Sequence, residues 1–369
     1  MKTQAAVLWG TGEDWNVEEI DLDAPRYGEV LVRMAAAGLC HSDEHLVTGD
    51  LPMEFPVIGG HEGAGVVEEV GPGVTTLAPG DHVVTAFFPI CGRCPSCVAG
   101  HSNLCDMGAS TLVGWQVLDG TARHHVGGKD IRLFCLTGTF GAHTVGSAAS
   151  FIKIDKDIPL DRAALVSCGV TTGWSSSVYR AGIGPGDAVA IVGVGGLGSA
   201  AVQGARLAGA SRIFAIDPVP YKREQAKRFG ATHVAESVDD AFSLIQDETH
   251  GRMCDKAVMT MGVSRGDMMA SVMSLVGKRG RVVVANMGDP FGVDVRLSLM
   301  DMLTYEKELV GSLFGSANAH NDVPMLLDLY RKGLLDLDGM ITKTYPLSDI
   351  NEGYQDMRDG KNIRGVVVY

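Results

Sequence analysis

The sequence lacks several features that would define its partners. No run of eighteen apolar residues occurs, so no transmembrane helix is expected. Basic residues are not in excess, because 31 lysines and arginines stand against 44 aspartates and glutamates, giving a net charge of −13. Nucleic acids and anionic membranes bind basic surfaces, so we expect neither as a partner. The first apolar stretch is short and soon meets acidic residues, unlike a signal peptide, which favours a cytoplasmic protein.

Length and composition indicate a globular protein of two domains. The chain has 369 residues, too long for one ordinary core. It is 46% hydrophobic and 20% charged, and it contains no internal repeat or low-complexity tract. Glycine is abundant at 48 residues, which suits tight turns and close approach of the backbone to a ligand. In a reducing compartment, its eight cysteines indicate metal binding or catalysis rather than disulfides.

Four of these cysteines lie within fifteen residues, in the segment CGRCPSCVAGHSNLC. They are Cys91, Cys94, Cys97 and Cys105, with the spacing C-x2-C-x2-C-x7-C. Zinc takes four thiolates tetrahedrally, and a gap of two residues lets a tight turn present two sulfurs to one ion. Four protein ligands leave no open coordination position. The segment 91–105 is therefore predicted to be a lobe that holds a structural zinc.

The pattern of strands and helices changes along the chain. Short strand patterns bounded by Gly, Pro and Asp fill the first third, which predicts a small barrel or meander. Residues 118–150 begin irregularly before strand patterns resume. From about Gly184, apolar strands such as DAVAIVGV alternate with helices, which predicts a parallel sheet with right-handed crossovers. Mixed elements return from about Ser312 and end in a strand, IRGVVVY.

A glycine-rich loop follows the first strand of the alternating region and opens a helix. It fits G-x-G-x-x-G, and its candidate cofactor-binding residues are Gly193, Gly195, Gly196, Leu197 and Gly198. Asp217 ends the next strand, where its carboxylate can bind both ribose hydroxyls and repel the 2′-phosphate of NADP, so NAD is favoured. Lys222 could reach the same ribose. The alternative is a glycine-rich turn without a ligand, which the order of strand, loop, helix and acid disfavours.

Three more residues carry side chains that bind metals. Cys40 lies in GLCHSDEH, His61 in GGHEGAG and Cys168 in VSCGVTTG. No local spacing unites them, and a lone cysteine is more often a small buried hydrophobe than a ligand. On spacing alone each of the three is ordinary.

Several motifs together resemble the zinc-dependent medium-chain alcohol dehydrogenases from end to end. They are GLCHSDEH, GGHEGAGVVEEVGPGVTTLAPGDHV, the four-cysteine lobe, SCGVTTG, GVGGLG and IRGVVVY, in the family's order and spacing. The segments DGTARHHVGGKDIRLF and GLCHSDEHLVTGDLP are most similar to the bacterial nicotinoprotein alcohol dehydrogenases, which are assayed with the artificial acceptor nitrosodimethylaniline. Class III enzymes, which oxidise the adduct of formaldehyde and glutathione, share much of this framework and are the alternative. A non-catalytic relative is a more remote one.

The resemblance implies a second, catalytic zinc bound by Cys40, His61 and Cys168, so that each chain holds two zinc ions. Such an ion, with three protein ligands and one open position, polarises an alcohol oxygen while hydride passes to the nicotinamide. Ser42 then matches the hydroxyl that accepts the alcohol proton, and His45 matches the base at the outer end of the relay. Asp43 and Glu62 resemble carboxylates that orient the metal ligands.

Other cofactor contacts follow from the same resemblance. Thr172 resembles the residue beside the nicotinamide, and Arg364 resembles a ligand of the pyrophosphate. His41 stands where many relatives carry arginine against the pyrophosphate. A histidine is a weaker and pH-dependent cation there, so a permanently bound cofactor would need other contacts or a closed cleft.

The expected fold is α/β, with a Rossmann doubly wound parallel sheet and a GroES-like β-barrel catalytic domain. The catalytic domain is expected to be discontinuous, at residues 1–168 and 313–369, and residues 169–312 to form the NAD-binding domain. The active site should lie in the cleft between them. The resemblance implies a small alcohol or aldehyde substrate, a homodimer or homotetramer, and an external electron acceptor for a nicotinoprotein.

Two pairs of residues have no assigned role. Cys135 and Cys254 have no partners in spacing and are interpreted as packing residues. His124 and His125 are adjacent, so on a strand they would point to opposite faces. We expect them in a loop near the cofactor or at an interface.

Overall fold

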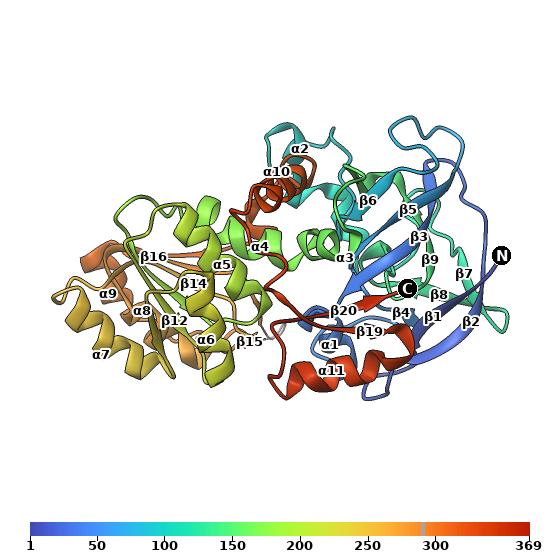
Figure 1. The fold of residues 1–369 in the computed structure, drawn as a ribbon. Helices are drawn as coiled ribbons and strands as arrows, with labels where there is room; N and C mark the ends of the chain where they lie inside the picture. The colour runs from blue at the N-terminus through green and yellow to red at the C-terminus, as the bar shows by residue number, and fades with distance from the viewer. Residues whose placement is uncertain (289–291) are drawn as a thin grey trace.

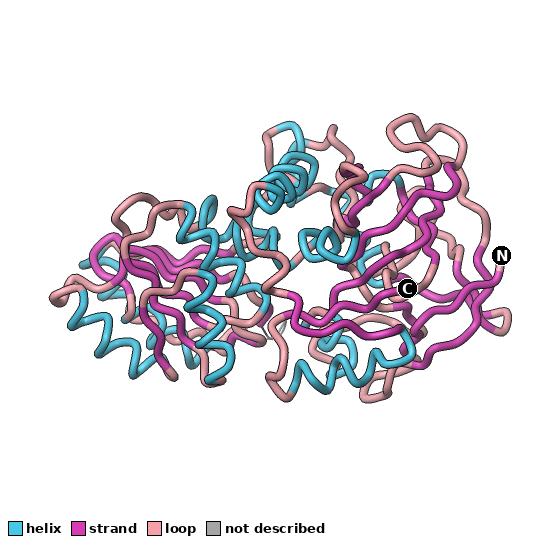
Figure 2. The backbone as a smooth tube through the Cα atoms, in the orientation of Figure 1, coloured by secondary structure: helices cyan, strands magenta, loops and turns pink. Residues whose placement is uncertain are grey.

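The computed structural model describes residues 1–288 and 292–369, which form two lobes (Figure 1). One lobe consists mainly of strands and contains both ends of the chain. The other is a parallel sheet with helices on both sides, as Figure 2 shows.

The strand-rich lobe contains a closed barrel and a larger sheet. The barrel follows the order β1 (Lys2–Leu8), β2 (Asn16–Leu22), β7 (His124–Val126), β8 (Lys129–Leu133) and β4 (Val57–Ile58). The sheet follows the order β10 (Phe151–Ile154), β6 (His82–Thr85), β5 (Glu62–Val70), β3 (Glu29–Gly38), β20 (Arg364–Val368) and β19 (Ile341–Pro346), and β9 (His143–Ser147) also pairs with β3. Helices α1 (His41–Thr48), α2 (Pro95–Val98), α3 (Leu160–Ala163) and α11 (Ile350–Arg358) complete this lobe.

Strand β3 is the centre of the larger sheet because its sequence is almost wholly apolar. EVLVRMAAAG has small and branched side chains, and most of them are buried. It pairs antiparallel with β5, with β9 and with the C-terminal strand β20. The last strand of the chain thus returns to the lobe that the first strands form, and the strand predicted from IRGVVVY is confirmed.

The second lobe is a six-stranded parallel sheet. Its order is β13 (His233–Ala235), β12 (Arg212–Ile216), β11 (Ala188–Val192), β14 (Cys254–Met259), β16 (Val276–Val284) and β18 (Glu308–Gly311). In chain order this is 3-2-1-4-5-6, the order of a doubly wound dinucleotide-binding sheet. All five residues of β11 are buried, as expected for a strand that helices cover on both faces. The predicted α/β architecture is confirmed.

Helices connect the strands of this sheet. They are α5 (Gly196–Leu207), α6 (Pro220–Phe229), α7 (Val238–Glu248), α8 (Met269–Ser274) and α9 (Leu299–Tyr305), and the short strands β15 (Val263–Ser264) and β17 (Met287–Gly288) belong to the same lobe. Helices α4 (Gly169–Ser175) and α10 (Ala319–Arg331) lie where the lobes meet (Figure 1). A Cβ on Gly173 would lie 2.0 Å from the Leu197 carbonyl oxygen, so α4 and α5 pack backbone to backbone.

The structure corrects the interpretation of His124 and His125. They do not lie in a loop near the cofactor, because both belong to β7, a strand of the closed barrel. His124 is buried and His125 is partly exposed, as the alternation of side chains along a strand requires. The irregular pattern between residues 118 and 150 therefore conceals the hairpin of β7 and β8.

Candidate active site and metal centres

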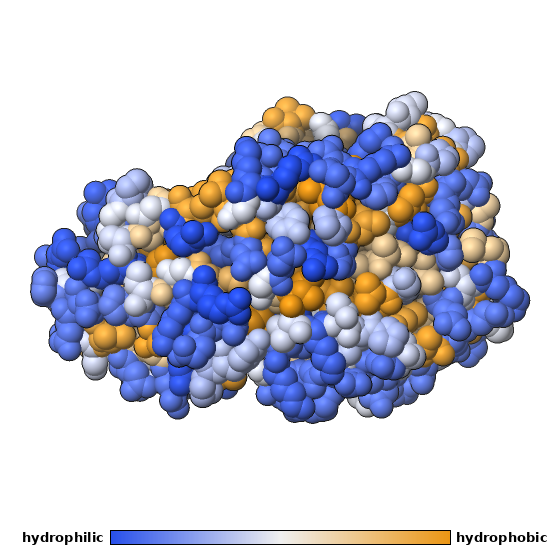
Figure 3. Space-filling view, viewed as in Figure 1, coloured by the Kyte–Doolittle hydropathy of each residue, from blue (hydrophilic) through white to orange (hydrophobic). Residues whose placement is uncertain are grey.

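A cleft of about 870 Å³ lies between the lobes. The strand-rich lobe contributes Ser42 and His45 to its lining, and the parallel sheet contributes Gly195 and Asp217 from the carboxyl ends of β11 and β12. Figure 3 shows apolar residues gathered in the middle of one face, where the lobes meet, with polar residues around them. Ligands of doubly wound sheets bind at this edge, where the strand order reverses.

Strand register brings three potential metal ligands to the cleft. Gly38 of β3 pairs with Glu62 of β5, so Cys40, two residues after Gly38, lies beside His61. Cys168 precedes α4 and joins them because Gly169 N–H donates to the Glu62 carboxylate, at 3.0 Å. The ligand atoms of Cys40, His61, Glu62 and Cys168 all lie within 4.8 Å of one another.

The side chains of this set fit a zinc ion. His61 is 1% exposed, and no residue that the structure describes forms a hydrogen bond with its Nε2. A buried imidazole nitrogen without a partner is costly unless a metal ligates it. A hydrogen bond between the thiols lowers the pKa of Cys40 and raises that of Cys168, so Cys40 ionises first. Two cysteines and one histidine are a donor set of catalytic zinc, and the nearby Glu62 carboxylate pairs with Arg364.

Asp43 orients the imidazole. Its Oδ1 accepts a hydrogen bond from Gly60 N–H at 2.7 Å, and its Oδ2 lies 3.2 Å from His61 Nδ1. Asp43 is fully buried, so its carboxylate is held beside Nδ1 and leaves Nε2 for a metal. Sequence reasoning placed Asp43 beside a ligand, and the structure places it against one.

Glu62 and Arg364 form a buried ion pair behind the thiols. Burial raises the pKa of Glu62 to about 7, although the Arg364 guanidinium opposes this rise. Arg364 also lines the cleft, and a Cβ on Gly196 would lie 2.2 Å from its Cδ. Its side chain therefore lies against the glycine-rich loop. Its contact with a pyrophosphate stays a prediction.

The glycine-rich loop has the geometry that its sequence predicts. Gly193 has φ +91°, which favours glycine, and a Cβ on Gly198 would lie 1.9 Å from the Gly193 carbonyl oxygen. Asp217 accepts hydrogen bonds from Val194 N–H and Val219 N–H, both at 2.9 Å. The carboxylate is thereby fixed at the end of β12, beside the loop and facing the cleft.

The remaining predicted site residues line the same cleft. Ser42 and His45 lie on α1, and His45 is buried with its Nδ1 3.2 Å from Asp50 Oδ2. The rings of His41 and His45 are 6.5 Å apart. The cleft lining also includes Thr172, Gly193, Gly195, Gly196, Leu197 and Lys222.

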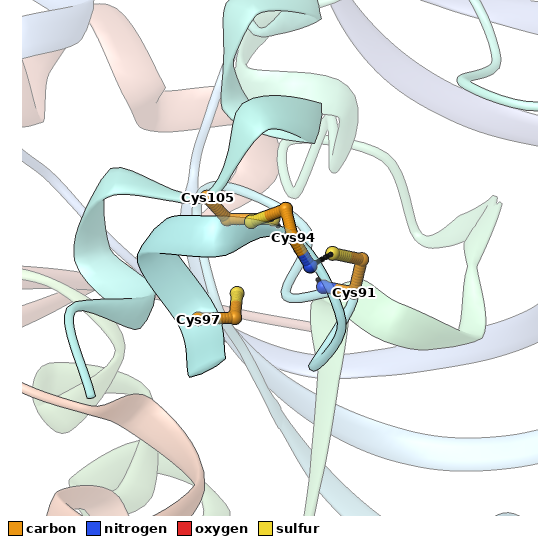
Figure 4. A group of neighbouring side chains, drawn as sticks. All are labelled: Cys91, Cys94, Cys97 and Cys105. Atoms are coloured by element: carbon orange, nitrogen blue, oxygen red, sulfur yellow. Dashed lines mark hydrogen bonds between the residues drawn. The ribbon is translucent and has the colours of Figure 1, made fainter. Parts of the chain in front are cut away.

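The four-cysteine lobe forms a second and separate metal centre (Figure 4). The sulfurs of Cys91, Cys94, Cys97 and Cys105 lie within 4.8 Å of one another. Cys94 N–H donates to Cys91 Sγ and Cys91 N–H to Cys105 Sγ, both at 3.3 Å. Backbone N–H groups of Arg93 and Cys94 lower the pKa of Cys91 to about 6, which favours a thiolate. Four cysteine sulfurs this close together fit the predicted structural zinc, because they fill its four coordination positions.

Comparison with known proteins decides the family. The alcohol dehydrogenase GroES-like domain matches residues 26–156, and the zinc-binding dehydrogenase domain matches residues 196–332. The chain is 49% identical to the NDMA-dependent alcohol dehydrogenase of Amycolatopsis methanolica, covering 100% of this chain and 99% of that protein. It belongs to the zinc-dependent medium-chain alcohol dehydrogenases. Alcohol dehydrogenase B of Mycobacterium tuberculosis is 50% identical, over 100% of this chain and 99% of that protein.

Solved structures of alcohol dehydrogenases have the same fold. A zinc-binding domain protein from Burkholderia ambifaria superposes with a TM-score of 0.93 at 31% identity, and benzyl alcohol dehydrogenase from Acinetobacter calcoaceticus with 0.92 at 27%. Each match covers 100% of this chain and 99% of the other. The two donor sets of this alcohol dehydrogenase provide for two zinc ions. Among the described residues, no helix is long and apolar enough to cross a membrane.

Sequence reasoning missed the apolar side of the substrate cleft in this alcohol dehydrogenase. Phe87 and Phe134 place their rings edge-on to His61, with centroids 6.0 and 5.3 Å away, and Phe314 packs on Phe87. Leu112 also lines the cleft. These residues are far apart in sequence and share no pattern, so only the tertiary structure could bring them together.

The interpretation of Cys135 and Cys254 as packing residues is confirmed. Both are buried in apolar clusters. Cys135 also lines the cleft, and burial raises its pKa to about 12, so it is a neutral thiol there.

Proposed function

We propose that the protein interconverts a primary alcohol and its aldehyde by hydride transfer with NAD(H). The observation that carries this proposal is the single cleft that Cys40, His61 and Cys168 share with the glycine-rich loop and Asp217. Zinc at the first three residues would polarise the alcohol oxygen and favour loss of its proton. The loop and Asp217 would hold the dinucleotide, with Asp217 selecting NAD over NADP.

The protein's own residues would manage the proton and exclude water. Ser42 can accept the hydroxyl proton, and His45, on the next turn of α1, can pass it outward. Phe87, Phe134 and Phe314 surround the reacting end with apolar side chains, which favours a substrate carbon over water. The test is turnover of short and aromatic primary alcohols by the purified enzyme. Oxidation of none of them, with zinc present, would reject the proposal.

We infer further that NAD(H) stays bound between turnovers. The support is the 49% identity, over the full chain, to a protein named NDMA-dependent. The absorbance and fluorescence spectra of the purified protein test this directly, because retained NADH absorbs and fluoresces. We expect on the order of one nicotinamide cofactor per chain. A protein without nicotinamide whose turnover depends on added NAD would contradict retention while leaving the alcohol dehydrogenase activity intact.

Two other functions are separated by simple measurements. A thiol-dependent formaldehyde dehydrogenase would turn over formaldehyde with glutathione faster than primary alcohols. A non-catalytic relative would lack the catalytic zinc. Metal analysis should therefore find about two zinc ions per chain, and about one in Cys40→Ser.

We propose that two copies pair through the sheet edge at β18. This strand ends the sheet order, so one of its sides is unpaired among the residues that the structure describes. Just before it, α9 exposes Leu299, Met300 and Leu303 at 78%, 67% and 75%. Exposed apolar residues beside an open sheet edge favour a homodimer, or a homotetramer built from it. Light scattering should show monomers for Leu303→Lys but not for Tyr27→Lys on the other lobe; a monomeric parent protein would refute the pairing.

We also propose the domain boundaries, the cellular location and the type of electron acceptor of this protein. We place the domain boundaries near residues 168 and 313, where the chain passes α4 and leaves the parallel sheet, and limited proteolysis there would test them. All eight cysteines are free, which supports a reducing, cytoplasmic location. An external acceptor would reoxidise retained NADH, and nitrosodimethylaniline is the probe for it.

A further inference from the structure

The end of helix α1 places a carboxylate beside the buried base of the proposed relay. The helix ends at Gly49, whose φ of +82° reverses the chain so that Asp50 folds back along it. Asp50 Oδ2 lies 3.2 Å from His45 Nδ1. The Thr48 hydroxyl donates to the same oxygen at 2.6 Å, and Leu51 N–H donates to the His45 carbonyl at 3.0 Å.

His45 and Asp50 differ in how far their side chains are exposed to solvent. The His45 side chain is 5% exposed, whereas that of Asp50 is 49% exposed. His45 also lines the cleft, so its ring is in contact with both the cleft and Asp50. A proton that reaches His45 from the cleft thus meets Asp50 on the ring's other nitrogen, at the protein surface.

The other charged groups near His45 do not offer an equivalent contact. Glu44, on the same helix, pairs with Arg358 of α11 at 2.8 Å. His41 has its ring centre 6.5 Å from that of His45, and Lys222 lines the cleft from the opposite lobe. Asp43 is directed to Gly60 and His61. Among the described residues, Asp50 is the carboxylate within hydrogen-bond distance of His45.

We propose that Asp50 is a positioning residue that orients His45 and opens the proton's exit to solvent. The proposal rests on the relay described under the proposed function. Asp50 accepts the Nδ1 proton of His45, so the Nε2 lone pair faces the cleft. When Nε2 gains a proton from the cleft, the N–H bond at Nδ1 breaks and that proton passes to the carboxylate and then to water. One proton leaves per alcohol oxidised, and no electrons move in this step.

The environment of Asp50 suits a transient carrier. The hydroxyl of Thr48, and then His45, lower the pKa of Asp50. The carboxylate is therefore ionised at neutral pH and ready to accept, and it releases a proton to water rather than retaining it.

The test compares four variants by single-turnover hydride transfer, followed as NADH absorbance across pH. For Asp50→Ala we expect the rate near neutral pH to fall by about tenfold, with KM for the alcohol within about twofold. The pH profile should differ from that of the parent, added formate or imidazole should restore part of the rate, and Asp50→Glu should retain most of it. The matched control is Asp130→Asn, whose carboxylate contacts His125 Nδ1 at 2.8 Å on the barrel and which should match the parent.

His45→Gln separates this inference from the relay itself. If His45→Gln transfers hydride at the parent rate, the relay is wrong and the role of Asp50 falls with it. If His45→Gln is slow but Asp50→Ala keeps the parent's rate and pH profile, the relay stands and only the role of Asp50 is refuted. A slow Asp50→Ala with an unchanged pH profile, no rescue and a lower Tm would also refute it, because the residue would then be structural.

Discussion

His124 should make the folded protein sensitive to acid in a measurable way. Its side chain is 1% exposed on β7, and neither ring nitrogen finds a hydrogen-bond partner among the residues that the structure describes. Burial, together with the nearby His125 and Arg123, lowers the pKa of His124 to about 3 from its ordinary value of 6.5. The ring is therefore neutral in the fold at every pH where the protein is usually handled.

The sign and size of the effect follow from proton linkage. Below pH 6.5 the unfolded chain binds a proton at His124 that the folded protein does not bind until about pH 3. Stability is thus complete above 6.5 and is lost progressively as the pH falls toward 3. Since each pKa unit corresponds to about 1.4 kcal/mol, the loss at pH 5 is about 2 kcal/mol.

The assay is urea unfolding of the parent and of His124→Leu, which replaces the ring by an apolar side chain of similar size. The free energy of unfolding of the variant, relative to the parent, should rise by about 2 kcal/mol between pH 7.5 and pH 5. Groups common to both proteins, including the zinc ligands, cancel in this difference. His125→Leu, on the opposite face of β7, controls for the loss of a histidine from this strand. A difference that stays constant from pH 7.5 to pH 5 would refute the reasoning.

The two metal centres should fail differently. Cys97→Ser should lower Tm and release one zinc per chain, whereas Cys40→Ser should keep the fold and abolish turnover; the reverse pattern in calorimetry and metal analysis would exchange their roles. Arg123→Met should lower the free energy of unfolding by about 3–5 kcal/mol, because it leaves the Glu29 carboxylate buried without its guanidinium partner. An effect no larger than that of Lys2→Met, in an exposed pair with Glu19, would show that the buried pair matters little. Gly198→Ala should abolish NAD binding in calorimetry, since its Cβ would lie 1.9 Å from a carbonyl oxygen, while Gly184→Ala, with open space around it, should bind normally.

The parts of this protein that the sequence determines by itself are local. Four cysteines in fifteen residues predict a closed zinc site, because short spacings constrain where their sulfurs can lie. The strand, glycine-rich loop and helix around Gly193 predict a dinucleotide site, because only glycine permits this turn and this close approach of the backbone. The alternation of apolar strands and helices likewise predicts the parallel sheet, which the structure confirms.

The catalytic centre was decided by long-range contacts. The spacing of Cys40, His61 and Cys168 in the sequence does not indicate a shared metal site, and only the family resemblance predicted one. In the folded chain, the register of β3 and β5 and the hydrogen bond from Gly169 N–H to the Glu62 carboxylate bring the three residues together. Strand register depends on the whole sheet, so no spacing within the sequence encodes it.

Tertiary structure also decided which histidines are buried and which groups their ring nitrogens contact. His124 proved to be a buried barrel residue, and His45 proved to be a buried residue whose Nδ1 contacts Asp50. The sequence alone does not show whether a histidine side chain is buried or exposed. Its protonation and its role depend on the burial and the partner atoms that only the folded chain supplies.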